Sequence, residues 1–153
     1  MADFAETLSQ GRRQDPKGRR QKAKGRTLLV LLLLTVAAAA LSAQAIRAVP
    51  RITIDELKAL MDQKAVVVVD VRDPPSFAQG RIPGAINIDY TMIFKQADRF
   101  AGEKRTIVAY CACATEMTAA RAAVDLASRG IPGAKALKGG WDEWVARAEK
   151  IEK

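Results

Sequence analysis

The sequence predicts an α/β domain built on a central parallel β-sheet, preceded by one N-terminal helix that crosses a membrane. Residues 27–46 form an apolar stretch without a single charge, and roughly 20 such residues are needed to span a bilayer. After it, apolar runs typical of buried strands alternate with helical patterns, which favours a parallel sheet covered on both faces. With 153 residues, of which 49% are apolar, the chain has room for one domain and its core.

The segment before the apolar stretch is polar and basic. Residues 1–26 hold eight Lys and Arg residues against three acidic ones, and their polar, charged composition predicts disorder. This flank accounts for most of the formal net charge of +8, so the basicity does not mark a nucleic-acid-binding face. Only 5% of the residues are aromatic, which also argues against a base-stacking surface.

The apolar stretch at residues 27–46 has two interpretations. It is either a retained anchor or the hydrophobic region of a signal peptide cleaved near Ala45, where Ala43-Gln44-Ala45 has the small-x-small form of a cleavage site. The long flank favours the anchor. By the positive-inside rule, the N-terminus is then cytoplasmic and the domain at residues 52–153 lies outside the cytoplasm, in the periplasm of a Gram-negative cell. Residues 47–51 form the expected linker.

The folded part begins at Ile52, and its elements have local signatures. Thr53 and Glu56 match a capping box at the start of a helix. The β-branched run within residues 65–70 is typical of a strand buried on both faces, and Asp73-Pro74-Pro75 ends it. Further strands are expected at residues 85–88, 106–110 and 134–137, and further helices at residues 76–80, 89–100, 117–128 and 140–149.

Cys111 lies where the strand at residues 106–110 meets a short loop, and a helix follows from Met117. At such a junction the loop N–H groups of residues 112–117 and the positive end of the helix dipole face the sulfur. This environment stabilises a thiolate, so we expect the pKa of the Cys111 thiol to fall from about 8.5 into the range ~3.5–7.5. The position suits a nucleophile or a carrier of an anionic sulfur species.

Missing residue types exclude several chemistries. The chain has no His, which removes His-based acid–base catalysis and His metal ligands. Cys111 and Cys113 are separated by one residue, and two such Cys do not make a zinc site. A Cys-x5-Arg phosphatase needs a guanidinium six residues after its nucleophile, where Met117 stands. No metal or organic cofactor is therefore expected.

Four segments stand in order around Cys111: VDVR (69–72), GRIPGAINI (80–88), VAYC (108–111) and LKGGWDEW (137–144). Together they resemble the rhodanese-like sulfurtransferase domain, with Arg81 in place of the family's His. The resemblance implies a three-layer rhodanese-like fold with a central parallel sheet. It also implies that Cys111 takes a sulfane sulfur from a donor such as thiosulfate, carries it as a persulfide and passes it to a thiol acceptor.

The loop at residues 111–117 departs from the pattern common in that family. It reads CACATEM, without the Arg and Gly residues of Cys-Arg-Ser-Gly-x-Arg-Ser loops, and it is similar to a subgroup with Cys-x-Cys-x-x-Glu loops. The missing cations and the nearby carboxylate disfavour the thiosulfate dianion, so we expect a neutral or protein-bound persulfide as donor. The resemblance assigns catalysis to Cys111, an active-site loop to Ala112, Cys113, Ala114, Thr115, Glu116 and Met117, and support to Asp70 and Arg72.

Several of these residues have more than one interpretation. Cys113 either relays sulfur or packs under the loop. Glu116 either caps the following helix through its carboxylate or acts as a base for an acceptor thiol. Asp70 and Arg72 either take part in acid–base chemistry or brace the end of the sheet, of which the brace is favoured, and Arg72 is also a source of positive potential near the sulfur.

Two alternatives concern the whole chain. One is a non-enzymatic binding module held at a membrane, which the absence of a loop Arg favours and the presence of Cys111 opposes. The other is a thiol redox sensor that uses Cys111 and Cys113. Outside the loop, we expect Arg81 at the surface and Trp141 and Trp144 in the core.

Overall fold

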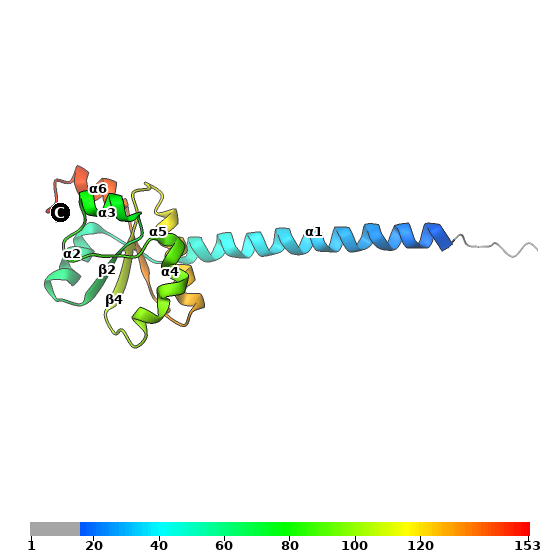
Figure 1. Cartoon of the computed structure of the whole chain (residues 1–153), viewed down its shortest axis with the longest axis horizontal. Helices are drawn as coiled ribbons and strands as arrows, with labels where there is room; N and C mark the ends of the chain where they lie inside the picture. The colour runs from blue at the N-terminus through cyan, green and yellow to red at the C-terminus, as the bar shows by residue number, and fades with distance from the viewer. Residues whose placement is uncertain (1–15) are drawn as a thin grey trace, which may run out of the picture. The chain divides into compact units, whose positions relative to one another are not determined.

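The computed structural model describes residues 16–153, which fall into two compact units divided after Leu41 (Figure 1). Helix α1, Pro16–Ala48, has 33 residues. Its first turns cover residues 16–26, part of the flank for which the composition predicts disorder. Lys, Arg and Gln are good helix formers, and a helix extends at little cost once an adjoining stretch is helical. The same prediction for residues 1–15 lies outside the described residues.

The apolar part of α1 is exposed to its surroundings. Leu28 and Leu41 are 70% and 69% exposed, although large apolar side chains are usually covered in a soluble protein. The stretch Leu31–Ala48 is long and apolar enough to cross a membrane, and a signal sequence meets the same criterion. Because α1 ends at Ala48 and the first strand begins at Arg51, the predicted linker at residues 47–51 shortens to residues 49–50.

A five-stranded parallel sheet forms the centre of residues 42–153 and confirms the predicted α/β fold. Its strand order is β1-β5-β4-β2-β3. β2 and β4 pair in register from Val66 with Thr106 to Asp70 with Tyr110. β1 has only two residues, and the sequence did not indicate it. The strands are β1 (Arg51–Ile52), β2 (Val66–Asp70), β3 (Ile86–Asn87), β4 (Thr106–Tyr110) and β5 (Lys135–Leu137).

The helices of residues 49–153 follow the strands in alternation. They are α2 (Ile54–Asp62), α3 (Pro74–Gln79), α4 (Tyr90–Gln96), the 3-10 helix η1 (Ala97–Phe100), α5 (Met117–Ser128) and α6 (Gly140–Ala146). The capping box of α2 is confirmed: the Glu56 N–H donates to the Thr53 hydroxyl, and the Glu56 carboxylate accepts from the Thr53 N–H. Asp73 caps α3, and Pro74 and Pro75 stand in its first turn, where no N–H is needed.

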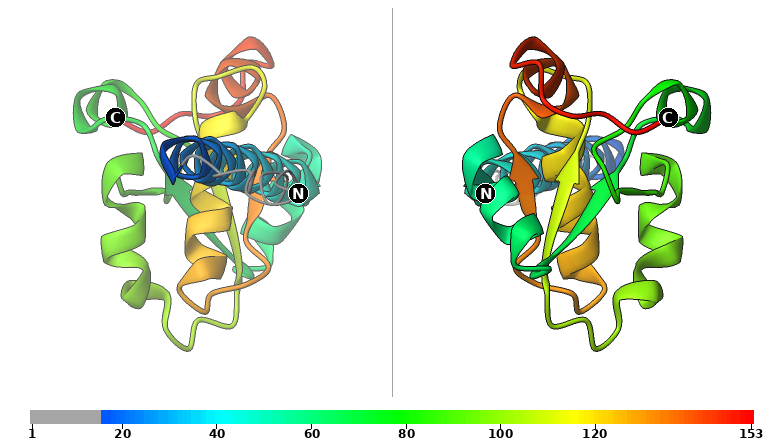
Figure 2. Two further views of the ribbon diagram at one scale, coloured as in Figure 1. Left: turned by 90° about the vertical axis from the view of Figure 1, so that its right-hand side faces the viewer. Right: turned by 90° about the vertical axis from the view of Figure 1, so that its left-hand side faces the viewer.

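Alternate residues of the central strands supply two apolar cores, one on each face of the sheet, and Figure 2 shows the helices that cover these faces. Ile107 and Ala109 pack in the core that includes α4 and α5. Val108 and Tyr110 point the other way, into the core that includes α2 and α6. This period of two follows from the pleat of a strand, and it makes the three layers that the resemblance implied. Both cores reach the end of β4, where Cys111 follows.

Candidate active site

Cys111 is the first residue after β4, and α5 begins six residues later at Met117. The carboxyl ends of parallel strands are where open α/β sheets place their sites. Cys111 itself is only 4% exposed, whereas Cys113 is half-buried. The remaining loop residues divide by exposure: Ala112, Ala114, Thr115 and Met117 are exposed, and Glu116 is half-buried.

Two thiols lie in the short loop before α5. The side chains of Cys111 and Cys113 interact, so that each shifts the pKa of the other. The Cys111 Sγ lies 3.9 Å from the Cys113 carbonyl oxygen, and the Cys113 Sγ lies 3.8 Å from the Thr118 hydroxyl oxygen. The N–H of Ala119 is directed at the Cys111 sulfur, and those of Met117 and Thr118 are directed at the Cys113 sulfur. The helix start therefore serves both sulfurs. Of residues 112–117, Cys113 provides a backbone N–H to the Cys111 sulfur, and the predicted cradle of all these residues stays a prediction.

The predicted fall in the pKa of the Cys111 thiol is also wrong. Burial raises this pKa to about 11, and the hydrogen bond with Cys113 adds to the rise, because a site with little water disfavours the thiolate. Burial opposes ionisation of Cys113 too. There it is outweighed by hydrogen bonds from the Cys111 thiol and from Thr118 and Met117, so the pKa of Cys113 is lowered. Negative charge in the resting site is therefore favoured on Cys113.

Glu116 does not cap α5, so the predicted cap is wrong. Its backbone is left-handed, with φ of 51°, and its side chain makes no capping hydrogen bond. The carboxylate turns instead to the Gly139 N–H, which donates to Oε1 at 2.7 Å. Sequence reasoning missed this contact because the two residues belong to different loops. The result is a tie between the Cys loop and the turn that precedes α6.

A second tie joins the same two segments. The Trp141 N–H donates to the Cys111 carbonyl oxygen at 2.8 Å. The backbone approaches so closely here that a Cβ at Gly140 would lie 2.1 Å from that oxygen, and Gly140 also has a left-handed φ of +53°. Glycine is therefore required by both space and conformation. This explains the Gly-Gly-Trp sequence found at residues 139–141.

Asp70 and Arg72 form a buried ion pair beneath this turn. Asp70 is fully buried, and the Nε and Nη2 of Arg72 donate to its two carboxylate oxygens at 3.0 and 2.5 Å. Arg72 also donates to the Gly80 carbonyl at 2.7 Å, and its guanidinium lies 4.3 Å from the centre of the Trp141 ring. With its charge matched by Asp70, Arg72 braces the sheet end and the Trp141 turn. The role of Tyr110, whose buried hydroxyl accepts a hydrogen bond from the Ile82 N–H at 3.2 Å, was not predicted.

Arg81 is tied to the end of the chain. It is only partly exposed, forms an antiparallel bridge with Glu152, and donates to the Glu152 carboxylate at 2.7 Å. The other Glu152 oxygen accepts from the Gly84 N–H at 2.9 Å. The expectation of a plain surface residue is therefore incomplete. Of the two tryptophans, Trp144 is buried, as predicted, while Trp141 is partly exposed.

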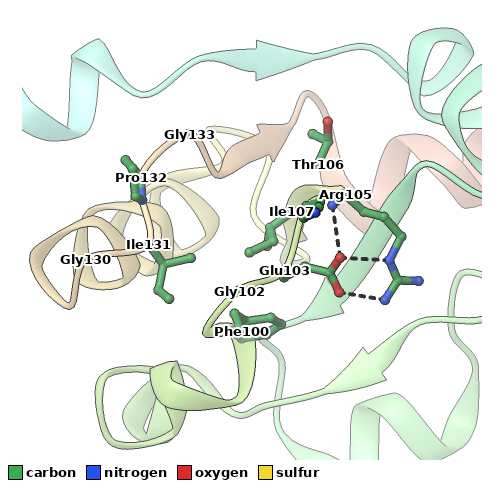
Figure 3. Close-up of a pocket in the computed structure, with 11 residues that line it drawn as sticks. Phe100, Gly102, Glu103, Arg105, Thr106, Ile107, Gly130, Ile131, Pro132 and Gly133 are labelled. Atoms are coloured by element: carbon green, nitrogen blue, oxygen red, sulfur yellow. Dashed lines mark hydrogen bonds and ion pairs between the residues drawn. The ribbon is translucent and has the colours of Figure 1, made fainter.

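A cavity of about 380 Å³ lies away from the sulfur atoms. Its wall comes from residues 102–107 and 130–133 together with Phe100, and Figure 3 shows the Glu103–Arg105 ion pair within it. β4 begins at Thr106 and ends before Cys111, so the cavity and the loop occupy opposite ends of the sheet. It contributes no residue to the candidate site.

Comparison with known proteins identifies the fold. Residues 53–147 match the family model described as a rhodanese-like domain. A thiosulfate sulfurtransferase GlpE of Pseudoalteromonas translucida is 32% identical over 108 residues, which cover 67% of this chain and 95% of that protein. The GlpE of Pseudomonas fluorescens is 35% identical over 94 residues, covering 61% and 83% of the two chains.

The fold also matches solved structures. A Rhodopseudomonas palustris protein of unknown function, described as a possible tyrosine phosphatase, superposes with a TM-score of 0.65 and 27% identity over 74% of this chain and 92% of that one. A thiosulfate sulfurtransferase from Pseudomonas aeruginosa has a TM-score of 0.62 and 23% identity, covering 71% of this chain and 21% of that one. The chain therefore belongs to the rhodanese-like domain family, in which it has sulfurtransferase relatives.

Proposed function

We propose that this chain is a sulfurtransferase that carries sulfane sulfur as a persulfide on Cys111. The main support is the position of that sulfur at the carboxyl end of β4, with the Ala119 N–H of α5 directed at it. An N–H group at a helix start stabilises an anionic sulfur. Relatives with about one third sequence identity are named thiosulfate sulfurtransferases, which supports the same reaction class.

The proposed reaction has two displacement steps. Once Cys113 has lost its proton, Cys111 passes its own proton to the neighbouring Cys113 and attacks the outer sulfur of the donor. The donor's S–S bond breaks, and its remaining sulfur leaves with the bonding electrons as a thiolate, which takes the proton from Cys113. Cys111 then holds a persulfide, whose outer sulfur is passed on to an acceptor thiol. Thiolate is the attacking form in such exchanges, so the proton acceptor beside Cys111 offsets the raised pKa of its thiol.

We propose a low-molecular-weight persulfide as the preferred donor. Residues 111–117 contain no basic side chain, and the buried guanidinium of Arg72 is already matched by Asp70. Charge-assisted hydrogen bonds from Arg are the usual way to hold a sulfur oxyanion. The thiosulfate dianion finds no such partner in the loop.

Intact-mass spectrometry tests this proposal. The full chain, purified in detergent, is incubated with thiosulfate or with glutathione persulfide, and Cys111→Ser is treated in the same way. We expect the parent to gain one sulfur atom, more readily from the persulfide, and the variant to gain none. A parent that gains no sulfur from either donor overturns the proposal.

We further propose that residues 27–46 anchor the rhodanese-like domain of residues 52–153 in the cell membrane, with the N-terminus in the cytoplasm. The length and composition of α1 support a span, and the basic flank supports the orientation. Protease added to cells with a permeabilised outer layer should digest the domain, whereas complete protection contradicts the orientation. N-terminal sequencing of the cellular protein distinguishes a retained anchor from cleavage near Ala45.

A membrane-tethered binding module is the second candidate function. It is favoured by the burial of Cys111, by the raised pKa of its thiol and by the absence of a loop cation. A buried thiol of this kind packs as a small apolar residue. The mass experiment separates the two, because a binding module gains no sulfur.

A further inference from the structure

We propose that Cys113 is a second catalytic residue, which takes the sulfane sulfur from Cys111 and presents it to the acceptor. The inference rests on the proposed persulfide of Cys111 and adds a step after it. Its first support is proximity: the Cys111 Sγ lies 3.9 Å from the Cys113 carbonyl oxygen, and both Cys belong to one short loop before α5. A sulfur transfer between the two side chains therefore stays within this loop.

Cys111 and Cys113 differ in exposure, and this difference explains why a transfer between them would help an acceptor to reach the sulfur. Cys111 is 4% exposed, and its backbone carbonyl accepts a hydrogen bond from the Trp141 N–H. A bulky acceptor thiol must reach the outer sulfur to attack it, and access limits thiol exchange. Cys113 is half-buried and lies between two exposed residues, Ala112 and Ala114. A persulfide on Cys113 therefore meets acceptors that cannot approach Cys111.

The surroundings of the two sulfurs also favour transfer of the sulfane sulfur from Cys111 to Cys113. The Cys113 sulfur faces the N–H groups of Met117 and Thr118, and the Thr118 hydroxyl lies 3.8 Å away. The Cys111 sulfur faces the N–H of Ala119 and the Cys113 backbone in a more buried position. An anion is better stabilised where more donors and more water surround it. The negative end of a persulfide is thus favoured on Cys113 and a neutral thiol on Cys111.

The relay is balanced without an added oxidant or reductant. The Cys113 thiolate attacks the outer sulfur of the Cys111 persulfide, Cys111–S–SH. A bond forms between that sulfur and the Cys113 Sγ, the bond to the Cys111 Sγ breaks, and its electron pair stays on Cys111. The Cys111 thiolate then takes the proton of the new persulfide, which leaves Cys111–SH and Cys113–S–S⁻. The number of S–S bonds is unchanged.

Attack on the inner sulfur is the competing reaction. It would release hydrosulfide and leave a Cys111–Cys113 disulfide. Only one residue separates the two Cys, and disulfides need a specific separation of their Cα atoms and direction of their Cβ atoms. Ring strain in so short a loop favours the outer sulfur, so the relay conserves the sulfane sulfur for an acceptor.

Time-resolved peptide mapping tests the relay. The full chain in detergent is mixed with a limiting amount of glutathione persulfide, quenched at intervals with acid, alkylated with iodoacetamide and digested with trypsin. Cleavage after Arg105 and Arg121 places both Cys in one peptide, and fragments broken at Ala112 assign the extra sulfur. We expect it on Cys111 at the earliest times and on Cys113 later.

Three variants separate the relay from the proposed function on which it rests. Cys113→Ser should load Cys111 fully but pass sulfur to reduced thioredoxin, a bulky protein thiol, roughly tenfold more slowly, since this acceptor must reach a buried sulfur. Cys111→Ser should load neither position. Ala127→Ser, which adds a hydroxyl at an exposed position in the last turn of α5 and away from the Cys loop, should behave like the parent.

Each contrary result has a definite meaning. Sulfur that stays on Cys111 in the parent, or a Cys111–Cys113 disulfide with release of hydrosulfide, overturns the relay and leaves the Cys111 persulfide intact. Direct loading of Cys113 in Cys111→Ser at the parental rate reverses the order and also overturns it. No sulfur on either Cys in any protein overturns the proposed sulfurtransferase itself. The parental time course needs no substitution, so a variant that fails to fold does not affect it.

Discussion

The carboxylate of Glu116 accepts a hydrogen bond from the backbone N–H of Gly139 at 2.7 Å. Glu116 is the last residue before α5, and Gly139 is the last before α6, so the bond joins the starts of two helices. The Trp141 N–H makes the second connection, to the Cys111 carbonyl. The turn at residues 139–141 therefore fixes both ends of the loop that carries the two sulfurs.

The Glu116 tie predicts different effects for two substitutions. Glu116→Gln keeps an oxygen that accepts from Gly139, so we expect sulfur loading and stability close to those of the parent. Glu116→Ala removes the acceptor and leaves the N–H unpaired, which should lower the free energy of unfolding by about 1–3 kcal/mol and slow loading. Urea unfolding followed by tryptophan fluorescence, with mass spectrometry of loading, measures both. If Glu116 were instead a base, Gln would slow transfer as much as Ala.

Gly140 predicts a steric effect on the Cys loop. In Gly140→Ala the new methyl group would lie 2.1 Å from the Cys111 carbonyl oxygen, and the left-handed backbone adds strain of about 1–3 kcal/mol. We expect a loss of stability and a displaced Cys loop, measured by urea unfolding and by the rate of sulfur loading.

The matched control is Gly133→Ala. Gly133 has a φ of +85° but no atom within 4 Å of an added Cβ, so it tests backbone strain without the clash. Equal losses of stability in the two variants would contradict the role of close approach at Gly140.

Asp70 predicts that the brace under the turn is essential for stability. In Asp70→Asn the buried guanidinium of Arg72 loses its counter-charge, and breaking such a pair costs about 3–5 kcal/mol. The exposed Glu103–Arg105 pair at the opposite end of the sheet supplies the control. Glu103→Gln should change stability little, because exposed pairs contribute little. A similar urea midpoint for parent and Asp70→Asn would show that Arg72 is held by Trp141 and Gly80 alone.

Local sequence patterns were sufficient to predict the central strands of the domain. The β-branched run at residues 66–70 and the apolar run at residues 106–110 became the two central strands, because such sequences are stable only when buried on both faces. β1 escaped prediction, since its two residues are held by pairing with β5. A pairing of this kind depends on the assembled sheet, and no pattern in the local sequence predicts it.

The site was predictable in position but not in its electrostatics. The strand-loop-helix pattern located Cys111 and α5 correctly. The direction of the pKa shift depended on the depth of the Cys111 sulfur and on its contact with Cys113, which follow from packing. The orientation of the Glu116 side chain likewise depends on its hydrogen bond with Gly139, which lies 23 residues away in the sequence. Both errors came from attributing the Cys111 pKa and the Glu116 side-chain orientation to the start of α5, whereas long-range contacts determine them.

The opposite pKa shifts of the two thiols predict the order of their alkylation. Only the thiolate reacts with iodoacetamide, so the lowered pKa of Cys113 makes it the first to be modified as pH rises. The rate for Cys111 should keep rising toward pH 11, since its thiol holds its proton up to about that value.

In Cys113→Ser the neighbour that helps to raise this pKa is gone, so the Cys111 profile should move to lower pH, although burial still keeps the pKa of Cys111 raised. Peptide mapping after short exposures gives both profiles. A Cys111 rate that levels off below pH 9.0, the ordinary value for this thiol, would show that the sulfur is ionised at rest and that Cys113 is not needed to take its proton.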